Sequence, residues 1–440
     1  MPSASPTHVQ ELDAPLLPSP VTELCARLEE HGIKAWVHGD GLLDALIPHL
    51  SHLPSRAPAG WGNERKTTHA LLCEGTGEAV LQALPSAVVT TAHQARLTQA
   101  TEWGPVDLIP LGSASLTLSL ASFGFSALAL AYRPTKAEWA ETNDALKKTR
   151  SGLLDLASPA PGTASSVVGN VFADAPRRYW IAPRLMAEYG LSISEAALNA
   201  AQAVFTEVAD VLPLGASARR MVDRVLASAE PGPALAFLRR SGVTPGLFPG
   251  AAASNEDLIG DLPPIQSVRW ATWLRGSATQ RGLVRLRAPH ALAKRVERVQ
   301  EAHPLDRSVP SLREASIRRI LNRLEAPELD ALFAWRRLEL DSEASVGNPA
   351  EIGQISDRLK GLEEKIAETR AGLARTGTVR SLMLDGAAVM QVLNIGPGRQ
   401  IGLALAHLAR FIEMHPEKNE RAELEAELLL WASRNPEKIS

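Results

Sequence analysis

The sequence predicts an α+β protein, in which a small αβ head is followed by an all-α remainder. Two observations lead to this prediction. Short apolar runs of strand length alternate with helical patterns up to about residue 150, whereas beyond it apolar residues recur almost throughout at helical spacing, interrupted by Pro and Gly. With 440 residues, the chain is also long enough for several domains.

The head begins with a strand between two helices. The apolar residues of 21–32 fall at helical spacing and end at a Gly, 33–39 has the composition of a short strand, and 42–50 returns to helical spacing. Four further strands are predicted, at 70–73, 87–90, 106–111 and 116–120.

The helical remainder contains one long amphipathic segment. Helices predicted at 193–212 and 218–229 follow an exposed loop near residue 161, and a longer helix begins near residue 350. Its apolar residues form a coiled-coil-like seam of Ile352, Ile355, Leu359, Leu362, Ile366 and Leu373, with Thr369 at one seam position. An antiparallel helical hairpin inside a bundle is favoured over a dimerising coiled coil.

Composition and motif content exclude several classes of protein. The net charge of −3 gives no overall basic field, so nucleic-acid binding would need local patches. The only two cysteines, Cys25 and Cys73, rule out a disulfide framework and a cysteine zinc site, and they fit a reducing cytoplasm. The sequence has no Walker, GxSxG or HExxH motif and no histidines at metal-ligand spacing, so we expect no metal site from these patterns.

The stretch 108–132 contains no charged residue and is long enough to cross a bilayer. Its frequent Ser and Thr, its alternating LTLSL section and the lack of a flanking Lys or Arg cluster oppose a membrane span. We therefore expect no membrane association, and the N-terminus shows no export signal.

Six segments resemble the motifs of one family in the order in which that family has them. They are VHGDGLLDALI at 37–47, THALLC at 68–73, VDLIP at 106–110, SLASFGFSALALAY at 119–132, DAPRRYWIAPRLMAEYGL at 174–191 and LDGAAVMQVLNIGPGRQIGLALAHL at 384–408. Their order over residues 21–435 resembles class II CCA-adding tRNA nucleotidyltransferases and bacterial poly(A) polymerases. The resemblance implies a nucleotidyltransferase-like αβ head and an all-α neck, body and tail. The divisions we expect are a disordered lead-in (1–20), the head (21–155), the neck (156–225), the body (226–330) and a tail with the helical hairpin (331–440).

The resemblance also implies that the metal site is degenerate. Thr68 and Ala70 stand where the family has the two aspartates that hold catalytic Mg²⁺, and no Asp or Glu occurs from 66 to 73. Asp107 matches the family's third carboxylate. Metal-assisted nucleotidyl transfer needs anionic oxygens to bind the metal, and neither Thr nor Ala supplies them.

The nucleotide-binding motifs are only partly kept. In the phosphate loop Gly39 and Asp44 match, but Asp40 replaces a Gly, and its charge would repel a phosphate. Gly124 and Leu128 replace an Asp and an Asn of the family.

In the neck, the resemblance makes Asp174 and Arg178 remnants of a protein template that reads the base of CTP or ATP. Ala175 replaces the Asp of the base-reading pair. For Arg178, contact with a base or phosphate and a helix salt bridge both stay open.

RNA contact is predicted where basic residues gather. Residues 281–325 contain eleven Lys and Arg against five Asp and Glu, at helical intervals. The residues expected to contact RNA are Arg295, Arg298, Arg318, Arg319 and Arg323. Solvated helix faces with internal ion pairs are the other interpretation.

These observations lead to one functional expectation and two alternatives. We expect a cytoplasmic pseudoenzyme of this family that binds tRNA or another structured RNA, with a protein partner also considered, and no cofactor. The first alternative is an active, Mg²⁺-dependent ATP/CTP-using tRNA nucleotidyltransferase or poly(A) polymerase with a relocated metal site of Asp40, Asp44 and Asp107. The second is a helical regulatory or scaffold protein that binds no RNA.

Overall fold

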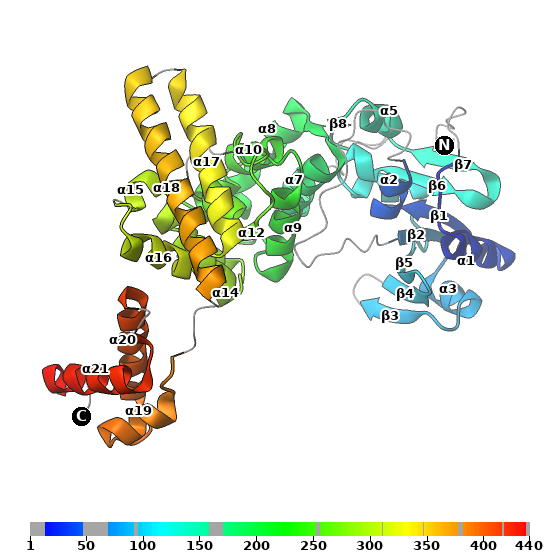
Figure 1. Cartoon of the computed structure of the whole chain (residues 1–440). Helices are drawn as coiled ribbons and strands as arrows, with labels where there is room; N and C mark the ends of the chain where they lie inside the picture. Colours follow the sequence, from blue (N-terminus) through cyan, green and yellow to red (C-terminus); the bar gives the residue numbers. More distant parts are fainter. Residues whose placement is uncertain are drawn as a thin grey trace. The chain divides into compact units, whose positions relative to one another are not determined.

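The computed structural model describes residues 14–46, 69–91, 96–157, 170–251, 256–309, 311–345, 347–376, 382–415 and 418–436 (Figure 1). Thr68, the side chain of Leu373, most of the predicted lead-in and the predicted loop near residue 161 lie outside the described residues. The chain forms two compact units, 1–293 and 294–440, and each is described by itself.

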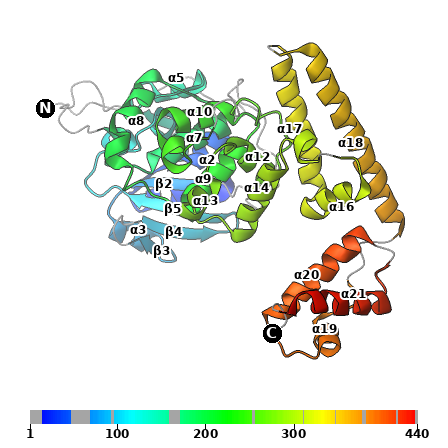
Figure 2. The same ribbon diagram turned by 90° about the vertical axis from the view of Figure 1, so that its left-hand side faces the viewer.

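The described residues of the head form one seven-stranded sheet. Its strands are β1 (Lys34–His38), β2 (His69–Glu74), β3 (Val88–Thr91), β4 (Arg96–Thr101), β5 (Gly104–Pro110), β6 (Leu130–Arg133) and β7 (Glu138–Glu141). The strand order is β3-β4-β5-β2-β1-β6-β7, in which β2 and β5 are parallel and all other neighbours are antiparallel. Figure 2 shows β2, β5, β4 and β3 in succession, with β3 at the edge.

Helices cover both faces of this sheet. One face packs against α1 (Ser19–Glu30), α2 (Asp40–Leu46) and α3 (Gly77–Ala83). The core between them includes Leu28, Val37, Leu42, Leu71, Val80 and Leu108, and both free cysteines are buried in it. The other face carries Trp36 and Leu72, which pack with Leu120 of α4 (Leu116–Ser122). Because side chains alternate along a strand, His38 points to the same face as Trp36.

The predicted strand at 116–120 is wrong, because this segment is the helix α4. LTLSL alternates in polarity, but the residue before it decides the structure. The backbone N–H of Leu118 donates to the Ser115 hydroxyl at 3.2 Å, which is a helix N-cap. The predicted strands at 70–73, 87–90 and 106–111 are confirmed as β2, β3 and β5, whereas the sequence patterns did not predict β4, β6 and β7.

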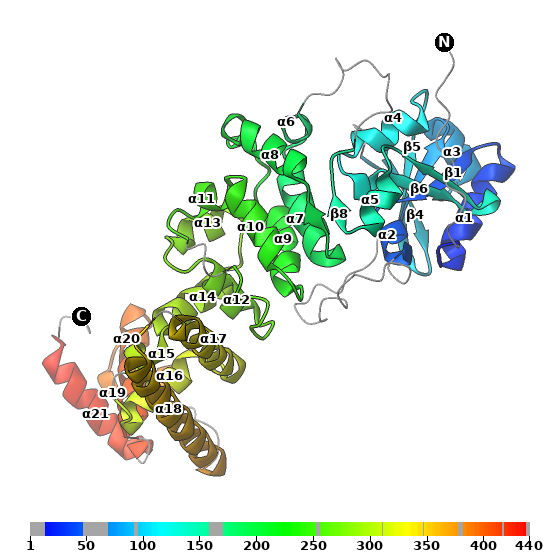
Figure 3. The same ribbon diagram turned by 90° about the horizontal axis from the view of Figure 1, so that it is seen from above.

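The rest of the first unit is helical. After α5 (Ala145–Arg150) and β8 (Leu153–Leu154) come α6 (Val171–Asp174), α7 (Arg178–Tyr189), β9 (Ser192–Ile193), α8 (Glu195–Val208), α9 (Ala216–Ala227), α10 (Gly232–Arg240), α11 (Val243–Leu247), α12 (Gln266–Trp273) and α13 (Thr279–Arg285). The central helix is α7, which packs against α9 and α10 (Figure 3). Nearly every residue of α7 is buried, so its polar side chains must find partners inside the protein.

The second unit is entirely helical in its described part. It contains most of α14 (His290–Ala302), then α15 (Leu305–Ser308), α16 (Glu314–Arg323), α17 (Ala326–Ala344), α18 (Pro349–Thr376), α19 (Gly386–Leu393), α20 (Arg399–Met414) and α21 (Arg421–Arg434). The predicted hairpin is confirmed, because α18 packs along α17 and the seam residues Leu359, Leu362 and Ile366 are buried (Figure 1). The last three helices enclose a core of their own.

Among the residues that the structure describes, every helix is too short or too polar to span a lipid bilayer. The strands of the head and the helices of the remainder confirm the predicted α+β fold class.

Candidate nucleotide site of the head

A row of paired residues crosses the α4 face of the sheet. His38 of β1 is opposite Ala70 of β2, and Ala70 is opposite Asp107 of β5. Asp107 is in turn opposite Thr98 of β4. Paired residues on neighbouring strands project from the same face. The sheet thus places Ala70 and Asp107, both identified in the sequence, directly side by side.

Asp107 is the only carboxylate of this row. Its Oδ1 accepts a hydrogen bond from the hydroxyl of Thr98 at 3.1 Å. In the described part of the chain, no three His, Cys, Asp or Glu side chains come together as a metal site would require. A single carboxylate supplies few of the oxygen ligands that Mg²⁺ takes from a protein, so this row fits the metal poorly.

At the β1 end of the row, His38 forms an aromatic contact with Phe123 and supplies no charge. The ring of His38 lies against that of Phe123, with centroids 4.0 Å apart. The Nδ1–H of His38 donates to the carbonyl oxygen of Leu130 at 3.1 Å, since a carbonyl only accepts. Burial lowers the pKa of His38 to about 4, and its bond to Leu130 opposes this only in part. His38 is therefore neutral at pH 7 and behaves as a packing residue.

Arg178 of α7 fixes the turn that follows α4. Its Nε donates to the carbonyl of Phe123 at 3.3 Å, its Nη1 to that of Val171 at 2.6 Å, and its Nη2 to that of Ser122. Gly124 in this turn has a φ of +90°, and a Cβ there would lie 2.4 Å from the Nε of Arg178. Both the backbone conformation and the close approach therefore require glycine.

All three guanidinium nitrogens of Arg178 are thus engaged by the backbone. Burial lowers the pKa of Arg178, and the neighbouring charge of Arg177 lowers it further, while Asp174 raises it. Asp174 is the last residue of α6, and Ala175 after it has no polar side chain. Arg178 could read a base only after giving up bonds to buried carbonyls, which is costly.

The remainder of the uncharged stretch is core. Phe125, Ala129 and Leu130 are almost fully buried, and Leu128 is 9% exposed. Leu128 lies in a 3₁₀ turn over residues 126–128 that leads into β6. The position at which the family has an Asn is therefore occupied by a buried aliphatic side chain.

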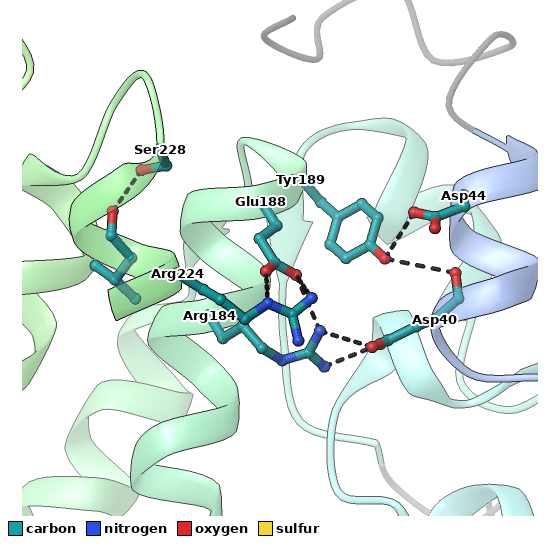
Figure 4. A network of polar contacts seen from close by, with 8 residues as sticks. Asp40, Asp44, Arg184, Glu188, Tyr189, Arg224 and Ser228 are labelled. Atoms are coloured by element: carbon teal, nitrogen blue, oxygen red, sulfur yellow. Dashed lines mark hydrogen bonds and ion pairs between the residues drawn. The ribbon is translucent and has the colours of Figure 1, made fainter. Parts of the chain in front are cut away.

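Asp40 and Asp44 of α2 contact the neck. The Nη1 and Nη2 of Arg184 donate to the two carboxylate oxygens of Asp40 at 2.8 and 2.9 Å (Figure 4). The hydroxyl of Tyr189 donates to Oδ1 of Asp44 at 3.1 Å. The backbone before them turns at Gly39, which has a φ of +76°. A guanidinium therefore balances the charge of Asp40, which the sequence alone suggested would repel a phosphate.

The sequence did not predict a role for His38, Glu188, Tyr189 or Arg224 in this region. His38 is a lone polar residue in an apolar strand, which is weak as a signal. Glu188 accepts from Arg184 at 3.0 Å and from Arg224 of α9 at 2.8 Å. Arg184 and Glu188 are four residues apart on one helix, and this spacing could have indicated their ion pair. It gives no sign that Arg224 binds Glu188 as well.

The five predicted RNA-contacting residues all lie in the second unit, and three of them are paired. Arg295 donates to Glu328 at 2.8 Å and to Glu325 at 2.9 Å. Arg318 pairs with Glu314 within α16, and Arg323 pairs with Glu301 of α14. Arg298 and Arg319 are exposed and form no ion pair with any residue that the structure describes. These last two have their charge available to a ligand.

Neither a family model nor a curated protein sequence matches the chain. Solved structures do match it. The CCA-adding enzyme of Bacillus stearothermophilus in complex with CTP is 16% identical and superposes with a TM-score of 0.62, covering 95% of this chain and 98% of its own. The Thermotoga maritima CCA-adding enzyme complexed with tRNA is 14% identical, with a TM-score of 0.57 and coverages of 93% and 94%. A CCA-adding enzyme in complex with ATP is 13% identical and superposes with a TM-score of 0.60, covering 94% of this chain and 95% of its own. The chain therefore has the fold of the CCA-adding enzymes over almost its entire length.

Proposed function

We propose that this chain is a member of the CCA-adding and poly(A) polymerase family that binds tRNA or another structured RNA and no longer transfers nucleotides. The observation that carries the proposal is the row His38, Ala70 and Asp107, which has a single carboxylate where metal-assisted transfer needs several. The sequence supplies no acidic residue nearby, since none occurs from 66 to 73.

The residues around this row support the loss of nucleotidyl transfer for a second reason. Phosphoryl transfer depends on cations and donors that stabilise the negative charge that develops. Here a neutral His38 packs against Phe123, and the donors of Arg178 are bound to carbonyls. Gly39, Asp174 and Arg178 are proposed remnants of a nucleotide site.

The RNA-binding part of the proposal has two supports. One solved structure with this fold is a CCA-adding enzyme complexed with tRNA. In addition, Arg298 and Arg319 are exposed without an intramolecular ion pair in the described residues, so phosphates could neutralise them. The proposed location of the protein is the cytoplasm, and the proposed division into head, neck, body and tail follows 21–155, 156–225, 226–330 and 331–440. A protein partner is a further part of the proposal.

The first alternative, an active enzyme with Asp40, Asp44 and Asp107 as metal ligands, has less support. Asp40 is held by Arg184 and Asp44 by Tyr189, on the side of α2 that faces the neck (Figure 4). Asp107 is bound by Thr98 on the α4 face of the sheet. A shared metal would have to compete with Arg184 for Asp40, because both carboxylate oxygens of Asp40 accept hydrogen bonds from that guanidinium.

A paired experiment tests the proposal. The purified chain is mixed with a tRNA transcript that lacks its CCA end, and binding is measured by gel shift at increasing salt while nucleotide incorporation is measured in the same samples. We expect a complex that weakens as salt rises, without incorporation. Incorporation would establish the active alternative, and failure to bind any structured RNA would favour the scaffold alternative.

A further inference from the structure

A network of side chains joins the head to the neck at α2. It consists of Asp40 and Asp44 from α2, Arg184, Glu188 and Tyr189 from α7, and Arg224 from α9 (Figure 4). Asp40 and Arg184 are 144 residues apart in the chain, so the contact is made only by the tertiary structure.

The network joins two guanidiniums to three carboxylates and is mostly buried. Arg184 is bound by two carboxylates, those of Asp40 and Glu188, and Arg224 shares Glu188 with it. The side chains of Arg184 and Glu188 are 7% and 6% exposed, and that of Asp40 is 25% exposed. Burial alone would lower the pKa of Arg184, but Asp40 and Glu188 together raise it. Without the Asp40 carboxylate, the buried Arg184 would have to share the single charge of Glu188 with Arg224, which leaves its own charge only partly compensated.

The geometry of the central pair restricts rotation. Both terminal nitrogens of Arg184 donate, one to each carboxylate oxygen of Asp40. Such a two-bond fork fixes direction as well as distance, unlike a single contact. Tyr189 adds a second point of attachment on α2, through Asp44. Two attachments four residues apart on the same helix prevent α2 from turning relative to α7.

The opposite side of α2 is fixed to the sheet. A Cβ on Gly41 would lie 2.2 Å from Nδ1 of His69 in β2, so the imidazole rests directly on the helix backbone. Leu42 and Leu46 are buried in the main core of the head. A restraint that the neck applies to α2 is therefore passed on to β2, which carries Ala70 of the row described above.

We propose that this network, called the lock below, holds head and neck together as one rigid body through α2. Asp40 makes the central contact, because it accepts both hydrogen bonds from Arg184. Arg178, which binds the carbonyls of Ser122 and Phe123, is a second attachment at the end of α4. The angle between the sheet and α7 is then fixed by the protein itself and does not depend on a bound ligand. This inference is independent of the proposed function, since an active enzyme and an RNA-binding pseudoenzyme could both contain it.

Hydrogen exchange of the full chain tests the lock. The variant Asp40→Asn removes the negative charge and one acceptor oxygen of the central pair, Arg184→Gln removes its guanidinium, and the double variant combines both changes. The control is Glu74→Gln, which weakens the contacts of a carboxylate to Trp36 and Lys34 inside the head and leaves α2 and α7 untouched. Exchange of the amides of α2 and the second half of α7 is followed in each protein.

We expect each single variant to exchange at least about tenfold faster in α2 than the wild type and the Glu74→Gln control, because breaking a buried pair loosens both helices. The double variant should be no faster than the faster single variant, since the two residues act together. Unchanged exchange in α2, an equal effect of Glu74→Gln, or fully additive effects would overturn the proposal.

If a central variant does not fold, Tyr189→Phe decides the question. It removes only the hydroxyl that donates to Asp44 and leaves the ring in the core. Faster exchange in α2, by about twofold or more, supports the lock. Exchange at the wild-type rate in Tyr189→Phe would refute it.

Discussion

The ring of His38 lies against the ring of Phe123, with centroids 4.0 Å apart, on the face of the sheet that also carries Asp107. The interplanar angle is 34°, and the imidazole is 3% exposed. A residue that could carry a positive charge is thereby kept neutral and is packed as an aromatic ring. This contact accounts for both the low charge of the site and a pH dependence of stability.

The pH dependence follows from the pKa of His38. Burial lowers it from its ordinary value near 6.5 to about 4. Between these values the unfolded chain binds a proton that the folded chain does not, so the folded state loses stability as the pH falls from about 6.5 to about 4. The loss should approach about 3 kcal/mol below pH 4 and should vanish about one unit above pH 6.5.

Urea unfolding at a series of pH values measures this effect. The variant His38→Asn keeps a donor for the carbonyl of Leu130 but does not titrate, so its stability should depend less on pH in this window. His69→Gln is the second comparison, because burial lowers the pKa of His69 as well. An identical pH slope in wild type and His38→Asn would contradict the assignment.

Restoring a carboxylate next to Asp107 should create a weak metal site. Ala70 is paired with Asp107 across neighbouring strands about 4.8 Å apart, so Ala70→Asp places two carboxylates on one face. We expect Mn²⁺ binding with a Kd of about 1 mM or tighter, measured by calorimetry, and no saturable binding by the wild type.

The matched control for this experiment is Ala70→Asn, which has the same shape without the charge and should not bind Mn²⁺. Adding Asp107→Asn to Ala70→Asp should abolish binding. Equal binding by Ala70→Asn and Ala70→Asp would show that the missing carboxylate is not what prevents metal binding.

Gly124→Ala should destabilise the chain. The new Cβ would be 2.4 Å from Nε of Arg178, and the φ of +90° disfavours any side chain. We expect a loss of at least about 1–3 kcal/mol of unfolding free energy. Gly353→Ala is the control, because a Cβ at Gly353 in α18 meets nothing within 4 Å and Ala favours helix by about 0.5–1 kcal/mol. Equal effects of the two substitutions would contradict the role given to Arg178.

Charge reversal at the two exposed arginines, Arg298 and Arg319, should weaken RNA binding. Arg298→Glu and Arg319→Glu should each raise the Kd for tRNA and reduce the slope of log K against log salt by about 1 for each phosphate that the variant no longer neutralises. Arg27→Glu, an exposed arginine of α1 in the head, should change neither. If all three variants bind tRNA equally, these two arginines do not contact the RNA.

The sequence predicts those strands and helices whose apolar residues recur at a regular spacing, because that spacing alone identifies them. β2 and β5 follow from their apolar runs, and α18 from its seam. The helix α4 was mistaken for a strand, since a five-residue alternation is too short to outweigh the cap at Ser115. β6 was missed because its residues continue an uncharged stretch without a boundary.

Only those parts of the candidate site that lie within a single local motif could be predicted from the sequence. Asp107 and Ala70 were identified from their motifs, and the sheet register places them together. The contact of His38 with Phe123 and the pairing of Asp40 with Arg184 join distant parts of the chain. No local pattern encodes such contacts, because they depend on how the turn after α4 and the helix α2 pack.

Nucleotide incorporation is the measurement that tests the central claim most directly. The purified chain is incubated with a tRNA transcript ending at the discriminator base, radiolabelled CTP or ATP, and either Mg²⁺ or Mn²⁺, beside an active CCA-adding enzyme as the positive control. The account predicts that the transcript keeps its length at every metal concentration at which the control enzyme extends it. Addition of a single C or A by the wild-type chain, lost in Asp107→Asn, would contradict it.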